Sequence, residues 1–145
     1  MNRDPSQQMV VRVAAAQATL DRFKDRPFAW GKYDCARLAA YHARKMGYRP
    51  SLSKAGPYAS AGSARAALKR LGFSSIIEAV DGMGFERIPP AAAMVGDLVA
   101  MPAVDALGAI AVVLGNGRVL GYHADAVGAA VLQPNEIDVA WRIKP

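Results

Sequence analysis

The sequence predicts an α+β domain in which a helical first half is followed by a strand-rich second half. Apolar residues recur at helical spacing in the first half, and short apolar segments separated by turns follow Pro89-Pro90. The dipeptide Asn116-Gly117 between two apolar runs is typical of a β-hairpin. At 145 residues, 52% of them hydrophobic, the chain can build its own core, so we expect one domain over residues 1–145.

Two helices are predicted before residue 50. The first begins at Asp4-Pro5 and ends near Asp25. The second spans Ala36 to Met46, with Gly47 in the C′ position after it. The apolar face of the first helix is marked by residues at helical spacing, namely Val10, Val13, Gln17, Leu20 and Phe23.

Two shorter helices and a sheet are predicted beyond an irregular segment at residues 48–60. Ser63 is expected to cap a helix that runs through Leu71 and stops at Gly72, and a short helix is expected from Ser75 to Val80. Five strands are expected to form an antiparallel sheet, at Asp97–Met101, Ala109–Leu114, Arg118–Tyr122, Ala129–Leu132 and Ala140–Ile143.

The only cysteine, Cys35, stands between a Trp30-Gly31 turn and the second helix. Asp34 can cap the exposed amides at that helix start, and the partial positive charge there favours the thiolate form of a cysteine. This placement suits a thiol nucleophile. A buried structural cysteine fits the same local pattern, because cysteine is among the most buried residue types.

Three motifs in order resemble the NlpC-type branch of papain-like cell-wall peptidases. They are Trp30-Gly31 with Asp34-Cys35 and a helix, then Gly96-Asp97-Leu98-Val99, then an apolar strand ending in 113–118. The resemblance implies a papain-like fold, with the Cys-bearing helix packed on the antiparallel sheet. It makes Cys35 the nucleophile and has the Gly96-Asp97 turn open the central sheet.

The same resemblance places a general-base histidine at the start of the next strand, where this chain has Ala109. An alanine cannot accept a proton. His123 follows the next strand, close to the place where these peptidases carry a third polar residue, and it is either a substitute base or a loop residue. His42 lies two helical turns after Cys35, about 10 Å away by helical rise, so it is a helix-surface or core residue.

The residues around Cys35 are expected to form the cleft or support it. Trp30 and Tyr33 should flank the cysteine, with Trp30 packed on the sheet. Asp34 and Asp97 are expected to act as a cap and a turn residue rather than as catalytic acids, because each directly precedes an apolar element.

Composition limits the cofactors and partners. A single cysteine excludes an intramolecular disulfide, and without the residue clusters of a zinc site neither a metal nor another cofactor is expected. The net charge is +6, but the basic residues gather near helix C-termini, where the macrodipole favours them, so no specific nucleic-acid partner is expected. No signal peptide or membrane span is legible, which predicts synthesis in the cytoplasm.

Two functions follow as hypotheses. Short chains with a Trp-Gly-x-x-Asp-Cys motif and an Ala-Trp-Arg-Ile-like end, here residues 140–143, resemble small proteins encoded in tail gene clusters of long-tailed phages. The first hypothesis is a structural protein of the virion tail tip or baseplate, with a degenerate site and with other tail-tip or hub proteins as partners. The second is a tail-associated peptidase or amidase that cleaves peptidoglycan with Cys35 as nucleophile and His123 as base.

A third function, lipid-acyl transfer as in permuted relatives, is disfavoured because those relatives place their histidine before the cysteine.

Overall fold

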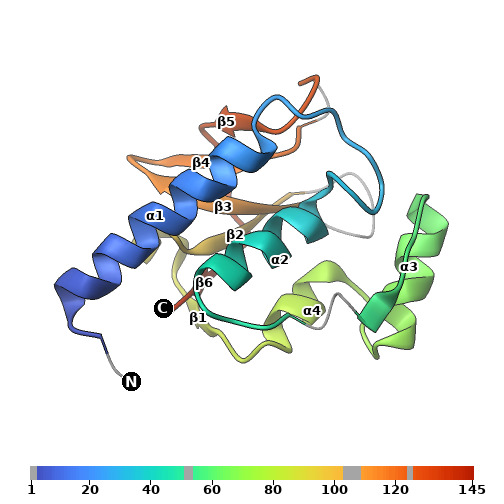
Figure 1. Ribbon diagram of the computed structural model, residues 1–145, viewed down its shortest axis with the longest axis horizontal. Coiled ribbons are helices and arrows are strands. Elements are labelled where there is room, and N and C mark those ends of the chain that lie inside the picture. The colour runs from blue at the N-terminus through green and yellow to red at the C-terminus, as the bar shows by residue number, and fades with distance from the viewer. Residues whose placement is uncertain (1–2, 51–53, 103–108, 124–125) are drawn as a thin grey trace.

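A computed structural model describes residues 3–50, 54–102, 109–123 and 126–145. These residues form an α+β domain with helices in the first half and an antiparallel sheet in the second (Figure 1). The elements in chain order are α1 (Pro5–Phe23), α2 (Cys35–Lys45), α3 (Ala61–Arg70), α4 (Ile76–Asp81), β1 (Glu86–Ile88), a 3-10 turn η2 (Pro90–Ala92), β2 (Leu98–Met101), β3 (Ala109–Gly115), β4 (Arg118–Gly121), β5 (Ala130–Leu132) and β6 (Val139–Arg142).

The sheet has the strand order β1-β6-β2-β3-β4-β5, and every neighbouring pair is antiparallel. Its tightest connection is the β3–β4 hairpin, where Gly115 pairs with Arg118 and only two residues form the loop. Those residues, Asn116 and Gly117, both have positive φ angles, as the favoured two-residue hairpin turn requires. The hairpin predicted from the Asn-Gly dipeptide is therefore confirmed.

Helices α1 and α2 cover one face of the sheet, while α3 stands apart at one end (Figure 1). The main core lies between that face and the helices. Successive residues of a strand point in turn to this core and to a smaller core on the opposite face of the sheet. Leu98 and Ala100 therefore face the helices, while Val99 faces away from them. A third cluster, formed by α3 and the segment before it, contains Ala55, Tyr58, Ala64, Ala67 and Leu68.

The helix starts follow the capping chemistry of the sequence. Asp4 forms a capping box at α1, Asp34 caps α2 and Ser75 caps α4. The predicted cap of α3 is wrong by three residues. Ser60 is the cap, and Ser63 is its N3 partner in a reciprocal capping box, because both serines offer a hydroxyl at helix-start spacing.

The predicted apolar face of α1 is confirmed at its C-terminal end, where Phe23 is buried and Leu20 packs against the core, and is wrong in the first half of the helix. Val10 and Val13 are 69% and 51% exposed, whereas α1 buries Arg12 and Thr19 together with Ala15, Ala16 and Phe23. The buried face is set by Asp97, which supplies a counter-charge for Arg12 from a distant part of the chain. The short edge strand β1 was missed by the sequence analysis because Glu86-Arg87-Ile88 has no apolar alternation.

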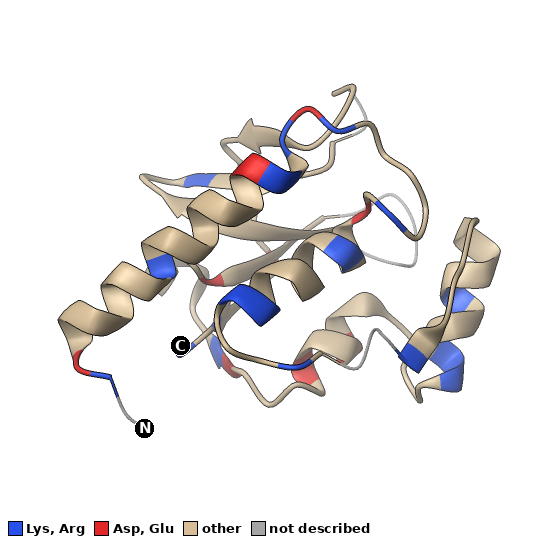
Figure 2. Ribbon diagram, viewed as in Figure 1, with Lys and Arg blue, Asp and Glu red and all other residues tan. Residues whose placement is uncertain are grey.

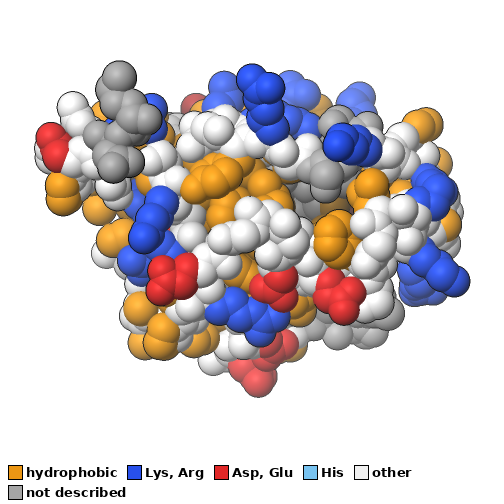
Figure 3. Space-filling model, turned by 90° about the horizontal axis from the view of Figure 1, so that it is seen from below, with side chains coloured by type: hydrophobic (Ala, Val, Ile, Leu, Met, Phe, Trp, Pro, Cys, Tyr) orange, Lys and Arg blue, Asp and Glu red, His pale blue; other side chains and the backbone are white. Residues whose placement is uncertain are grey.

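Charged residues are dispersed along the ribbon rather than gathered in one basic segment (Figure 2). Basic residues occupy the last turns of α1, α2 and α3, as the macrodipole argument predicts. On the face seen from below, both signs of charge alternate with apolar patches (Figure 3).

Candidate functional site

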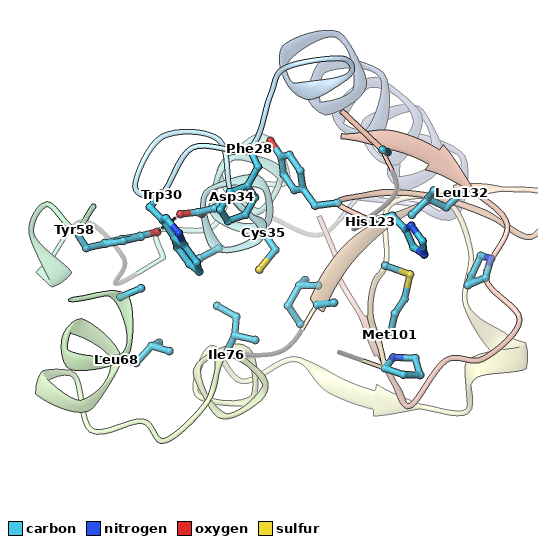
Figure 4. Close-up of a pocket in the computed structure, with 18 of the residues that line it drawn as sticks. Phe28, Trp30, Asp34, Cys35, Tyr58, Leu68, Ile76, Met101, His123 and Leu132 are labelled. Atoms are coloured by element: carbon cyan, nitrogen blue, oxygen red, sulfur yellow. Dashed lines mark hydrogen bonds between the residues drawn. The ribbon is translucent and has the colours of Figure 1, made fainter. Parts of the chain in front are cut away.

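Cys35 is the first residue of α2, and this helix packs against the central strand β3. The predicted position of the cysteine at a helix start beneath an antiparallel sheet is confirmed. Its side chain is partly exposed, and the sulfur points into a cavity between α2, α4 and the sheet (Figure 4). The thiol therefore stands at the positive end of a helix and faces open space.

Asp34 fixes this helix start. Asp34 is 2% exposed, and its carboxylate accepts hydrogen bonds from the backbone N–H groups of Gly31 (2.8 Å) and Arg37 (2.7 Å). The hydroxyl of Tyr58 donates a third bond, of 2.8 Å, to the same carboxylate. Asp34 is thus the helix cap that the sequence predicts, and its three hydrogen bonds hold the turn, the helix start and Tyr58 together.

Gly31 is required by the turn before the helix. Its φ is +79°, and a Cβ at this position would lie 2.2 Å from the carbonyl oxygen of Tyr58. No side chain fits so close to a backbone oxygen. The Trp-Gly dipeptide therefore lets the chain bring Tyr58 and Asp34 together, and this contact positions Cys35.

The cavity has a volume of about 810 Å³. One wall is aliphatic and comes from α3 and α4, with Leu68 and Ile76 labelled in Figure 4. A second wall is aromatic, and there Phe28 makes edge-to-face contacts with Trp30 (4.8 Å between centroids) and Tyr122 (5.4 Å). The sheet and the segment 133–136 after β5 close the remaining side.

Ala109 is the first residue of β3, pairs with Met101 of β2, and lines the same cavity as Cys35. The strand start that the sequence analysis singled out therefore contributes to the wall of the cysteine site. Its methyl group adds apolar surface and no proton acceptor at this position.

His123 follows β4, is exposed, and also lines the cavity. It lies beside Met101 and Leu132 toward the sheet end, whereas Cys35 projects from the α2 end (Figure 4). The fold thus brings the two predicted catalytic residues to one cavity, on different parts of its wall.

His42 is the core residue that one of the two sequence interpretations predicted, with 0% exposure. Its Nε2 donates to the carbonyl of Gly96 (2.8 Å), and its Nδ1 lies 3.1 Å from the hydroxyl of Thr19. Burial lowers the pKa of His42 below its usual range, because a charged imidazolium would lose its hydration. Both ring nitrogens are engaged in tying α2 to α1 and to the turn before β2.

The two aromatic residues near Cys35 lie on different sides. Trp30 lines the cavity and packs against the α3 cluster, so its predicted packing on the sheet is wrong. Tyr33 packs in the main core, with its ring in an edge-to-face contact with Phe23 (5.9 Å between centroids). The tight turn at Gly31 separates these side chains, which is why only Trp30 contributes to the cavity.

Gly96 and Asp97 form a buried junction. Asp97 is 0% exposed and forms ion pairs with Arg12 (2.9 Å) and Arg142 (3.0 Å). It also accepts from the backbone N–H groups of Met94 and Ile143, both at 3.0 Å. The predicted turn role of Asp97 is confirmed, and its ion pairs extend that role to a link between α1 and the sheet.

Two tyrosines of the site were missed by the sequence analysis. Burial raises the pKa of Tyr58 and of Tyr122 above the ordinary tyrosine value, and the charge of Asp34 adds to both shifts. Both rings line the cavity. The Gly56-Pro57 turn before Tyr58 gives no sign that this hydroxyl will meet a carboxylate 24 residues earlier.

Fold and site together define an α+β protein with a cysteine at a helix start that faces a large, mainly apolar cavity. The chain belongs to the family described as domain of unknown function DUF6950, whose model matches residues 11–143. No curated protein and no solved structure matches the chain.

Within the described ranges, no helix has the length and apolarity needed to cross a membrane. The same residues contain no group of three or more histidine, cysteine or acidic side chains arranged to hold a metal ion.

Proposed function

We propose that this chain is a structural protein of a phage tail tip or baseplate, with a papain-like (NlpC-type) fold whose peptidase site has lost its base. The observation that carries the proposal is Ala109, which lies at the strand start in the cavity wall where the resemblance calls for a histidine. Loss of a general base removes a contribution of typically ~10² to 10⁴ in rate.

The buried histidine supports the same proposal. His42 is held by Thr19 and Gly96 inside the core, and burial lowers its pKa, so it is a structural residue. The polar side chain nearest in sequence to Cys35, Asp34, is engaged by three donors. Asp34 and His42 thus stabilise the backbone around the cysteine, and this role is consistent with a structural function.

A genetic complementation experiment tests this proposal in the phage or prophage that encodes the chain. Deleting the gene is expected to abolish infectious particles, and the wild-type chain should be found in purified tails by mass spectrometry. Cys35→Ala is expected to restore particle production as well as the wild-type gene does. Failure of Cys35→Ala to complement, with normal expression, would contradict a structural function.

A second candidate is a tail-associated peptidoglycan peptidase or amidase. It is favoured by one observation: Cys35 at the start of α2 and His123 after β4 line the same cavity. In this hypothesis the thiolate attacks a peptide carbonyl and His123 transfers the proton.

Thiol reactivity separates the two candidates. For the structural function, Cys35 is expected to react with iodoacetamide no faster than free cysteine, and His123→Ala should leave this rate unchanged. A rate well above that of free cysteine that is lost in His123→Ala would favour the enzyme. Release of peptides from purified peptidoglycan that Cys35→Ser abolishes would establish it independently.

A further inference from the structure

The cavity beside Cys35 has an unusual charge for this chain. The sequence contains 18 lysines and arginines and carries a net charge of +6. The described residues that line the cavity nevertheless include two acids, Asp34 and Glu136, and no lysine or arginine. The segments outside the described ranges contain no lysine or arginine in their sequence, so they cannot supply one.

The aromatic wall adds to this preference. Phe28, Trp30 and Tyr122 form a row of edge-to-face contacts along the cavity. The faces of aromatic rings attract ammonium and guanidinium groups, most strongly where water is displaced. The rest of the lining is mainly aliphatic, so a ligand that fills the space must be largely apolar.

Positive groups also lie close to the cavity, among them Arg70, whose guanidinium donates to the carbonyl oxygen of the lining residue Ala55 (2.8 Å). The N-terminus of α2 points its amides toward Cys35, but the Asp34 carboxylate accepts from this end of the helix. The guanidinium carbon of Arg37 lies 5.2 Å from the centroid of the Tyr58 ring, and Arg37 is not among the residues of the lining. Neither Arg37 nor Arg70 belongs to the described lining of the cavity, whereas the exposed acid Glu136 does.

We propose that the cavity is the docking site for an apolar peptide segment of a neighbouring protein, and that this segment inserts a lysine or arginine side chain. The inference rests on the proposed structural function, which supplies neighbouring tail proteins as partners. Charge complementarity selects the basic side chain, and a volume of about 810 Å³ accommodates several side chains at once. Side-chain amides of Gln133 and Asn135 on the rim provide hydrogen-bonding groups for the peptide backbone.

The only cysteine of the chain gives a direct test, because its sulfur lies inside the cavity (Figure 4). Cys35 is reacted with two methanethiosulfonate reagents of similar size, one with a trimethylammonium group and one with a sulfonate. In each reaction the thiol loses its proton to water, a disulfide bond forms to the reagent, and methanesulfinate leaves. The rate ratio of cationic to anionic reagent is compared with the ratio for free cysteine.

The ratio for Cys35 is expected to exceed that of free cysteine by at least about tenfold, although the net charge of the chain alone would favour the anion. Glu136→Gln should lower the ratio. Glu86→Gln, which removes an exposed acid on β1 outside the cavity, should leave it unchanged. A ratio at or below that of free cysteine would overturn the proposal.

A second measurement tests the peptide as occupant. Capped peptides Ala-Leu-Lys-Leu-Ala, with glutamate or norleucine versions as controls, are added at about 1 mM before reaction of Cys35 with neutral methyl methanethiosulfonate. The lysine peptide is expected to slow the reaction at least about threefold, and the glutamate peptide should not. Equal protection by both peptides would overturn the charge argument. Protection of Cys35 by 4-phenylbutylamine without protection by the lysine peptide would make the cavity a small-molecule site and overturn peptide docking. Protection of Cys35 that rises with protein concentration, in the absence of any peptide, would make a second copy of the chain the occupant and would also overturn it.

These results are independent of the particle experiment. If the charge ratio is absent while Cys35→Ala still complements the deletion, the structural function stands and only the docking site is wrong. If the ratio is present but complementation fails, the cavity binds a basic apolar segment and the proposed function is wrong.

Discussion

Two buried aspartates organise two different regions of this molecule. Asp97, at the junction of α1, β2 and β6, is surrounded by Arg12, Arg142 and two backbone donors. Asp34, at the start of α2, accepts from two nearby backbone groups and from Tyr58. Asp97 therefore joins segments that are far apart in sequence, whereas Asp34 mainly shapes a local turn.

The difference explains why one region is closed and the other open. At the Asp97 junction, Arg12, Thr19 and His42 are all buried, and hydrogen bonds connect them to the turn before β2 or to each other. Beside Asp34 the neighbouring surface is apolar and encloses empty volume around Cys35. Stability is thus expected to depend on the first region, and binding on the second.

The largest effect is expected from Asp97→Ala. The substitution leaves Arg12 buried without its counter-charge and removes an acceptor from three other donors, and breaking a buried ion pair in this way typically costs about 3–5 kcal/mol. The free energy of unfolding in urea measures it. Asp21→Ala, at an exposed position of α1, is the control and should change stability by less than about 0.5 kcal/mol.

If Asp97→Ala does not fold, Arg142→Gln provides a milder version of the same test. It removes one of the two ion pairs of Asp97, and the arginine side chain is 25% exposed. A loss of about 1–2 kcal/mol is expected from the weakened hydrogen bonding. Unchanged stability in both variants would show that the junction does not hold α1 to the sheet.

A smaller effect is expected from Gly31→Ala in the open region. The new Cβ would meet the carbonyl oxygen of Tyr58 at 2.2 Å, so the turn that positions Cys35 must move, with an expected cost of at least about 2 kcal/mol. Gly117→Ala is a matched control, because its φ is +73° and no atom lies within 4 Å of the added Cβ. Both variants strain the backbone, but only Gly31→Ala adds a steric collision, so its thermal unfolding midpoint should fall further than that of Gly117→Ala. Equal decreases of the two midpoints would contradict the close approach of Gly31 to Tyr58.

The smallest effect is a pH dependence from His42. Its folded pKa is lowered by burial, so the unfolded chain binds a proton first as the pH falls below about 6.5, and stability is lost there and regained above it. Between pH 6.5 and 5.5 the expected loss approaches about 1 kcal/mol. Urea unfolding across this range measures it. His123→Ala should keep this dependence and His42→Gln should remove it, while a dependence that persists in His42→Gln would assign it to another group.

The sequence by itself determined the features that depend on neighbouring residues. Asp4, Asp34 and Ser75 cap helices because a side-chain oxygen reaches an amide two or three residues later, whatever the rest of the chain does. Asn116-Gly117 forms its hairpin for the same local reason, since both residues tolerate positive φ. The position of Cys35 at a helix start followed from these signals.

Only the tertiary structure decided what is buried and what faces the cysteine. Val10 and Val13 are exposed because Arg12, on another side of α1, finds a counter-charge 85 residues away at Asp97. The burial of His42 depends on Thr19 and Gly96 in the same way. Ala109 and His123 meet Cys35 in one cavity because β3, β4 and α2 pack together. Such contacts join residues far apart in the chain, and the free energy that fixes them comes from packing and charge pairing that no local pattern records.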